Sequence, residues 1–212
     1  MRIIINIVKM MLLITATSFL FGSSCNKNGS KLCTMVTPYS FNVTSEFSPQ
    51  KEIYNVGDTI FLKSAISKTL INNISNQQVE YSNSLGVGGN IGIALIDSTN
   101  RKFEIGTDSF NFESINGNIT LGTNKVLNIL FKETSILYIL EIKLIAKTKG
   151  NYVIGVSDLS SQGIKNKDCT NAGFSMLVTN SNKHFDILAN ANIPGVTIDA
   201  QRMATNYCFR VR

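Results

Sequence analysis

The stretch from Ile136 to Ser157, ILYILEIKLIAKTKGNYVIGVS, decides the fold class. In its first half an apolar side chain recurs at every second position, at Ile136, Tyr138, Leu140, Ile142, Leu144 and Ala146. Glu141 and Lys143 fall between them. A period of two puts these sets on opposite faces of a β-strand. A helix would place the two charges less favourably, and Ile, Tyr and Leu at this density favour a pleated surface. We therefore predict a strand with one buried and one solvated face.

Shorter segments of the same kind fill the chain from residue 39 onward, broken by Gly, Asn and Ser clusters. We predict strands at residues 39–44, 59–64, 77–82, 91–97, 102–113, 126–134, 136–146, 149–157 and 172–178. No long segment repeats with a helical period of 3.6 residues. The pattern indicates an all-β domain.

The end of the chain has a different pattern. We predict a short strand at Phe185–Leu188 and a closing strand at Tyr207–Val211. Between them, Thr197 is expected to cap a short helix, with Asp199 in its first turn and Arg202 towards its end, where the helix dipole favours these charges. About 30 residues bury too little apolar surface to fold alone, so this extension is expected to pack on the main domain.

Two segments resemble the bacterial immunoglobulin-like domain. Tyr54–Ile60 (YNVGDTI) resembles the turn that enters its second strand, where the Gly takes the tight turn and the Asp side chain stabilises it. Lys149–Ser157 (KGNYVIGVS) resembles its penultimate strand, in which the Tyr hydroxyl bonds to backbone at the corner. The resemblance implies an immunoglobulin-like antiparallel β-sandwich over residues 39–212. Another antiparallel sandwich or a barrel is the alternative.

The predicted core draws on the inward faces of both sheets. Its members share an alternating apolar position in a predicted strand. They are Ile60, Leu62, Leu140, Ile142, Tyr152, Ile154 and Val156.

Residues 1–24 have the layout of a secretory signal peptide. Arg2 and Lys9 are basic, residues 10–21 are almost wholly apolar, and Gly22, Ser23 and Ser24 are small. Cys25 follows directly, and the polar run Asn26–Ser30 follows the cysteine. An uncleaved membrane anchor and plain secretion are the alternatives.

The segment ending at Cys25 resembles a bacterial lipoprotein signal of the Bacteroidetes type, although Gly22 stands where the strict motif has Leu. The resemblance implies cleavage before Cys25, lipidation of its thiol, and a tether over residues 25–38. Several acyl chains anchor a protein stably without a transmembrane helix. The implied location is the outer membrane. Residues 26–30 lack the acidic side chains that mark surface export in that family, which favours the periplasmic side over the cell surface.

Charge argues against a nucleic-acid partner. The chain has 212 residues, with 20 Lys+Arg and 14 Asp+Glu. Two of the basic residues lie in the predicted signal peptide, which leaves 20 − 2 = 18 basic against 14 acidic residues after cleavage. The excess is mild and spread along the chain, without the Lys/Arg clusters of nucleic-acid binders.

Three cysteines remain if Cys25 is lipidated: Cys33, Cys169 and Cys208. In an oxidising compartment this number indicates one disulfide and one odd thiol. All three pairings are open from the sequence. We favour Cys169–Cys208, because Cys33 lies in the tether and a bridge to Cys208 would hold the C-terminal extension. The spacing fits no zinc motif.

No catalytic constellation stands out. His184, the sole histidine, lies in a polar stretch and is expected to be a solvent-exposed turn residue; no GxSxG nucleophile motif occurs. The acidic residues Glu104, Asp108, Glu113 and Glu141 are interpreted as the solvated faces of strands. Leu85–Ile91 lacks the Lys-Ser/Thr ending of a phosphate loop, and we interpret it as a bulged strand entry in which Gly supplies a positive φ.

These observations favour a non-enzymatic envelope lipoprotein that binds a protein or a glycan and carries no cofactor or metal. One alternative is a hydrolase that uses two carboxylates on a sandwich face, which would need two acidic groups converging in a concave pocket. A second is a fimbrial or adhesin-type subunit, which would need a groove that accepts a strand from a neighbour.

Overall fold

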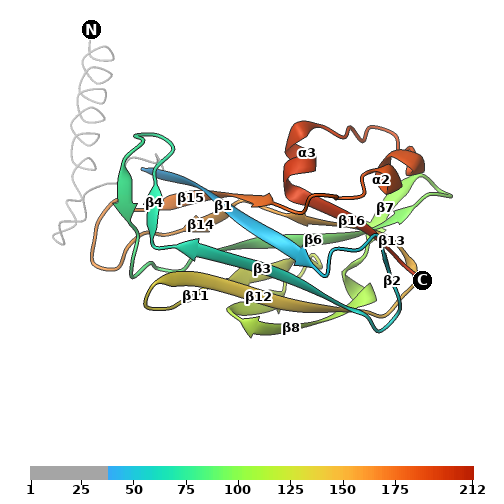
Figure 1. Cartoon of the computed structure of the whole chain (residues 1–212), viewed down its shortest axis with the longest axis horizontal. Helices are drawn as coiled ribbons and strands as arrows, with labels where there is room; N and C mark the ends of the chain where they lie inside the picture. The colour runs from blue at the N-terminus through green and yellow to red at the C-terminus, as the bar shows by residue number, and fades with distance from the viewer. Residues whose placement is uncertain (1–37) are drawn as a thin grey trace, which may run out of the picture. The chain divides into compact units, whose positions relative to one another are not determined.

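The computed structural model describes residues 38–212, which form a β-sandwich of two sheets (Figure 1). The predicted signal peptide, Cys25, Cys33 and all but the last residue of the predicted tether lie outside the described residues. Among residues 38–212, no helix is long and apolar enough to cross a membrane.

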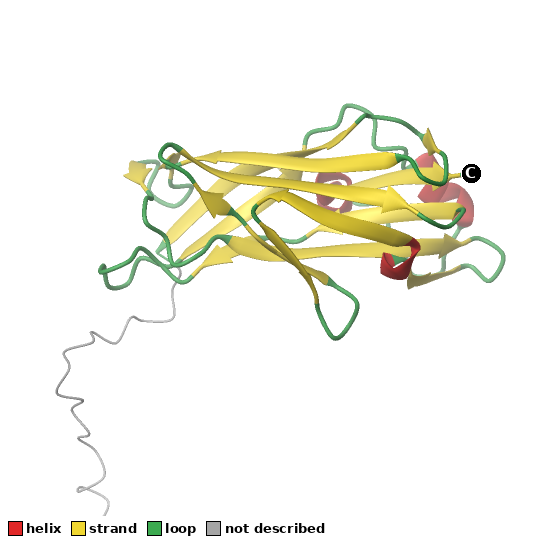
Figure 2. Ribbon diagram, turned by 90° about the horizontal axis from the view of Figure 1, so that it is seen from below, coloured by secondary structure: helices red, strands yellow, loops and turns green. Residues whose placement is uncertain are grey.

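We call the two sheets A and B, and strand β1 (Tyr39–Ser48) belongs to both. The other strands of sheet A are β2 (Ile53–Tyr54), β6 (Gly88–Asp97), β7 (Lys102–Ile105), β9 (Asn118–Leu121), β10 (Leu127–Leu130), β13 (Gly150–Val156), β14 (Leu159–Ser161), β15 (Ala172–Val178) and β16 (Asn206–Val211). Those of sheet B are β3 (Thr59–Ser67), β8 (Phe110–Asn116), β11 (Lys132–Glu133) and β12 (Leu137–Ala146). A separate ribbon pairs β4 (Thr69–Ile71) with β5 (Gln78–Glu80). Figure 2 shows the strands of the sandwich from below.

Strand β1 changes sheets along its length. Its first part, Tyr39–Ser45, pairs with β15, and its end, Glu46–Ser48, pairs with β3. The β1–β15 pairing is parallel, and so is the pairing of β16 with β2. The β-sandwich prediction is therefore confirmed, but the expectation of a purely antiparallel one is wrong. Each parallel pair includes a strand from one end of the described chain, β1 or β16.

The core lies between the sheets as the alternation predicts. Tyr138, Leu140, Ile142, Leu144 and Ala146 of β12 are each at most 1% exposed. All seven predicted core residues are buried. Ile136 departs from the pattern, with 70% of its surface exposed, because β12 begins one residue after it.

Both local features predicted at Tyr54–Ile60 and Lys149–Ser157 are present. Gly57 takes a φ of 91°, and the Asp58 carboxylate accepts a hydrogen bond from the backbone N–H of Asn55 at 3.0 Å. Tyr152 is fully buried, and its hydroxyl donates to the Thr148 carbonyl oxygen at 2.9 Å. The predicted turn and the predicted tyrosine corner are therefore confirmed.

Two predicted strands are each divided between the sheets. Residues 102–113 form β7 in sheet A, a 3₁₀ turn at Thr107–Ser109, and β8 in sheet B. Gly106 marks this crossing, because a Cβ there would lie 2.8 Å from the backbone nitrogen of Leu95. Residues 126–134 divide in the same way into β10 and β11 around buried Phe131.

The C-terminal extension contains two short helices, α2 (Asp186–Ala191) and α3 (Ala200–Thr205), before the closing strand β16. The predicted strand at 185–188 is wrong, because Ile187, Leu188 and Ala191 are buried on one side of a helical turn. Asp199, rather than Thr197, caps α3 by accepting a hydrogen bond from the backbone N–H of Arg202 at 2.8 Å. Arg202 lies in the last turn, as expected.

Candidate functional site

The C-terminal extension packs on the outer face of sheet A, where a second apolar cluster forms. Ile96, Val153 and Cys208 contribute from the strands, and Ile187, Leu188 and Ala191 contribute from α2. Figure 1 shows both helices on this face of the sheet. The expectation that the extension packs on the sandwich is confirmed.

An open cleft of about 490 Å³ lies between this face and α3. Its volume is within the range of small-molecule sites. The lining residues come from β6, β7, β13, α2 and the segment around α3. They are Gly92, Ile93, Ala94, Phe103, Val153, Gly155, Leu188, Asp199, Gln201, Arg202, Thr205 and Asn206.

Two paired glycines leave part of the cleft floor without side chains. Gly92 of β6 and Gly155 of β13 are cross-strand partners. A Cβ built on Gly92 would meet no heavy atom within 4 Å, whereas one on Gly155 would lie 2.9 Å from the Asn206 side-chain oxygen. Glycine inside a strand weakens it and often marks a place where a ligand or another backbone approaches closely. The floor is therefore bare backbone, open to a ligand at Gly92.

The walls differ in polarity. Ala94, Phe103, Val153 and Leu188 provide an apolar part, and these residues belong to or pack against the second apolar cluster. The segment Asp199–Asn206 provides the polar part, with one carboxylate, one guanidinium, two amides and one hydroxyl. Such a combination can hold a ligand that has both an apolar face and polar groups.

Arg202 has no side-chain partner within residues 38–212. Its backbone N–H is used by the helix cap, but the guanidinium forms neither an ion pair nor a hydrogen bond with any described residue. Two other arginines near α2 do have partners: Arg210 lies 3.2 Å from Glu52 and 3.9 Å from Asp186, and Arg101 donates to the Asn192 carbonyl oxygen at 2.8 Å. The guanidinium is therefore free to pair with a ligand, while the Asp199 carboxylate lines the same cleft.

The predicted disulfide between Cys169 and Cys208 is wrong. Cys208 has a free thiol and is completely buried under the C-terminal extension. Burial raises the pKa of this thiol to about 12. Cys169 is disulfide-bonded, and Cys208, whose thiol is free, is not its partner. The predicted lipidation site Cys25 also lies outside the described residues.

His184 is buried rather than solvent-exposed, which corrects the sequence-based expectation. It adopts a φ of 52°, and its ring meets that of Tyr207 edge to face at a centroid distance of 5.9 Å. Its Nε2 atom has no hydrogen-bond partner among the described residues. The ring packs against Tyr207, and within residues 38–212 no carboxylate forms an ion pair with it.

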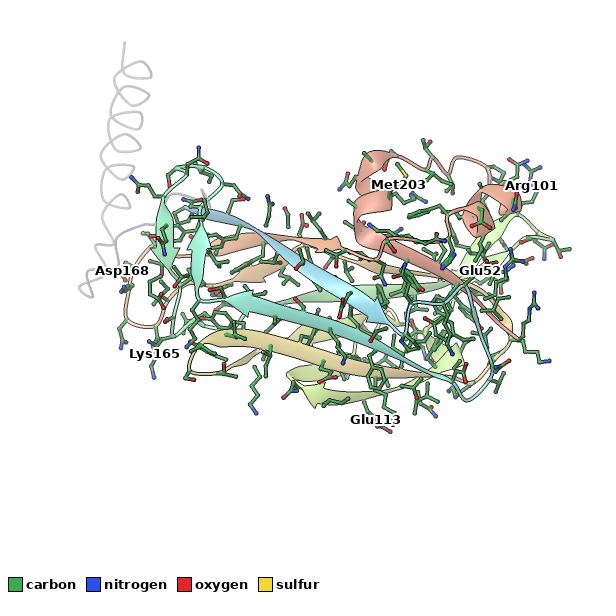
Figure 3. The ribbon with its side chains drawn as sticks, viewed as in Figure 1. Glu52, Arg101, Glu113, Lys165, Asp168 and Met203 are labelled. Atoms are coloured by element: carbon green, nitrogen blue, oxygen red, sulfur yellow. The ribbon has the colours of Figure 1, made fainter. Side chains whose placement is uncertain are left out.

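The four acidic residues considered for hydrolysis are each paired with a lysine. Glu104 pairs with Lys102 and Glu141 with Lys63, at 2.8 and 3.1 Å. Asp108 and Glu113 line one open hollow of about 480 Å³, but they pair with Lys125 and Lys143, and their side chains are 66% and 60% exposed. Figure 3 shows Glu113 at the outer edge of the molecule. This hollow lacks the dry environment that a carboxylic general acid requires.

The described residues contain no group of three or more His, Cys, Asp or Glu side chains placed to hold a metal ion.

The predicted glycine-rich strand entry is present. Gly86 has a φ of 96° and lies two residues before Gly88, the first residue of β6. The prediction of a positive-φ glycine at this strand entry is confirmed.

Sequence reasoning missed the cleft. The signal was present in the glycines Gly92 and Gly155, each inside an otherwise apolar strand pattern. Their pairing depends on the register of β6 with β13, which joins residues about 60 positions apart and is invisible to local patterns. For Arg202, the local pattern indicates only a favourable interaction with the helix dipole.

No protein-family model and no curated protein matches the chain. A human F-spondin reeler domain is 9% identical, with 63% of this chain and 80% of that chain covered, at a TM-score of 0.33. A cohesin module from a Clostridium perfringens family 33 glycoside hydrolase is 9% identical, with 65% and 98% covered, at 0.34. A type II cohesin dyad from the Acetivibrio cellulolyticus ScaA scaffoldin is 12% identical, with 65% and 46% covered, at 0.34. These distant likenesses concern the β-sandwich and assign no ligand to this chain.

Proposed function

We propose that the chain is an outer-membrane lipoprotein, anchored through Cys25 and facing the periplasm, whose immunoglobulin-like β-sandwich is a non-catalytic binding module. Its ligand is part of a glycan or a protein of the envelope, and this part binds in the cleft between sheet A and α3. The anchor follows from the signal-like residues 1–24 and the cysteine after them. The binding role is supported by the cleft.

The observation that carries the proposal is the bare floor at Gly92 and Gly155 beneath polar side chains of the α3 segment. A strand glycine gives up cross-strand packing and conformational entropy. At Gly92 this loss is not explained by crowding, because a Cβ there would meet nothing within 4 Å. Access for a ligand explains it.

Gly92→Val tests the site. The larger side chain projects into open cleft space, so it should block the ligand without disturbing the core. The full-length protein and this variant would be compared on arrays of purified envelope glycans and of envelope-protein peptides. Asn128→Val, an exposed position on neighbouring β10, is the matched control. We expect binding to be lost with Gly92→Val and kept with the control. Equal binding by all three proteins would refute the proposed site.

Cys25→Ala tests the anchor separately. The wild-type protein should incorporate labelled palmitate and partition into the detergent phase, and the variant should do neither. Retention of the variant in the membrane fraction would contradict lipid anchoring.

A further inference from the structure

Arg202 sets the charge that the cleft prefers in a ligand. Its guanidinium lines the cleft and has no ion-pair partner among the described residues. Guanidinium and carboxylate match in a planar, bidentate geometry that forms two parallel charge-assisted hydrogen bonds. A ligand with a carboxylate would supply the ion-pair partner that Arg202 lacks.

Asp199 limits how negative the ligand can be. Its carboxylate also lines the cleft, where it accepts the backbone N–H of Arg202 at 2.8 Å and caps α3. This fixed negative charge repels a second anionic group. A ligand with a single carboxylate on the Arg202 side suits this pair better than a phosphate with two charges.

The rest of the lining fits a sugar ring. The bare backbone at Gly92 offers a flat surface, and Phe103 provides an aromatic wall for the apolar face of a ring. The Gln201 amide can donate to and accept from hydroxyl groups, and the Asn206 amide adds N–H donors, its oxygen being an acceptor for Thr205. The Thr205 hydroxyl is already used, because it lies 3.1 Å from both the Gln201 carbonyl oxygen and the Asn206 amide oxygen and donates its proton to one of them.

We propose that the cleft binds an acidic sugar, a uronic acid residue of a polysaccharide, with the sugar carboxylate on Arg202 and the ring over Gly92. This inference rests on the proposed function, which assigns binding to the same cleft. It adds the chemical class of the ligand and the residue that selects it.

The test compares two probes that differ in one group, methyl β-D-glucuronide and methyl β-D-glucoside. Binding to the full-length protein in detergent would be measured by saturation-transfer difference NMR. We expect the glucuronide to bind about tenfold more tightly, as one charge-assisted contact allows. Arg202→Gln should remove the preference, and Arg202→Lys should restore part of it. Lys165→Gln, at the end of the sandwich away from α3 in Figure 3, is the control and should keep it.

The outcomes separate this inference from the proposed function. Equal affinity for the two glycosides, or no binding of either, overturns the acidic-sugar assignment and leaves the cleft open to another ligand. A preference for glucuronide that survives Gly92→Val places binding elsewhere and overturns the proposed site itself.

Discussion

Tyr152 and Thr148 are joined by a hydrogen bond of 2.9 Å from the tyrosine hydroxyl to the threonine carbonyl oxygen. This bond closes the turn between β12 and β13, one strand from each sheet. The ring of Tyr152 packs edge to face on Phe110 at 5.0 Å and stacks on Phe209 at 5.8 Å. One residue therefore connects both sheets and the closing strand.

Two substitutions at Tyr152 separate the bond from the packing. Tyr152→Phe removes the hydroxyl alone and should lower the free energy of unfolding by about 1 kcal/mol. Tyr152→Ala also empties the ring site and should lower it by about 3–5 kcal/mol. Urea denaturation followed by circular dichroism measures both. Equal losses for the two variants would contradict the separate contribution of the ring.

Buried tyrosines should make the fold sensitive to alkali. Burial raises the pKa of Tyr138 to about 12, and it also raises the pKa values of Tyr81, Tyr152 and Tyr207. The unfolded chain loses these protons near pH 10, so the folded state binds more protons between the two values. The contribution of these buried, protonated tyrosines to the free energy of unfolding is therefore fully present below about pH 10. It is lost as the pH rises through about 12.

Tyr138→Phe tests the alkaline loss at one position. Its hydroxyl donates to the Tyr81 carbonyl oxygen at 2.6 Å. The variant should be less stable at pH 8. Between pH 10 and 12 its free energy of unfolding should fall less steeply than that of the wild type, and the two slopes should differ by at most about 1.4 kcal/mol per pH unit. Urea midpoints at a series of pH values measure this. Parallel curves for wild type and variant would show that Tyr138 does not contribute.

Local alternation was enough to predict most of the sandwich. The two-residue period was enough to locate β12 and the core positions, because burial on one face constrains each strand independently. It could not predict that β1 and β16 return to parallel neighbours, since parallel pairing depends on contacts distant in sequence. The helix α2 was missed because four apolar-rich residues at 185–188 fit either structure.

The cleft shows the same limit. Gly92 and Gly155 become a floor through one cross-strand register, and Arg202 faces it because α3 folds back over sheet A. Neither relationship has a local sequence signature. The anchor, in contrast, is a linear signal that is predicted from the sequence alone.

Cys208 should be inert in the folded protein. Its thiol is completely buried, and burial raises its pKa to about 12, so the reactive thiolate is scarce at neutral pH. We expect no labelling by N-ethylmaleimide at pH 7.5 in native protein and rapid labelling in urea, as measured by peptide mass spectrometry. Rapid native labelling would contradict the packing of the C-terminal extension over β16.

The parallel pairing of β1 with β15 brings two chain segments to the same end of sheet A. Tyr39 is the partner of Ala172. Cys33 precedes the first of these residues by six positions, and Cys169 precedes the second by three. Chain segments of three to six residues reach up to about 3.5 Å per residue, which is more than enough to bridge the distance between two neighbouring strands.

We therefore predict a disulfide between Cys33 and Cys169. Cys169 is disulfide-bonded, Cys208 is a free buried thiol, and Cys25 is the predicted lipid attachment site, which leaves Cys33 as the partner. Export to an oxidising compartment supplies the oxidant that removes two electrons and two protons from the thiols. Non-reducing peptide mapping should show the linked peptides. Cys33→Ala should expose the Cys169 thiol to alkylation, and Cys25→Ala should not. A linked Cys25–Cys169 peptide would overturn both this pairing and lipidation at Cys25.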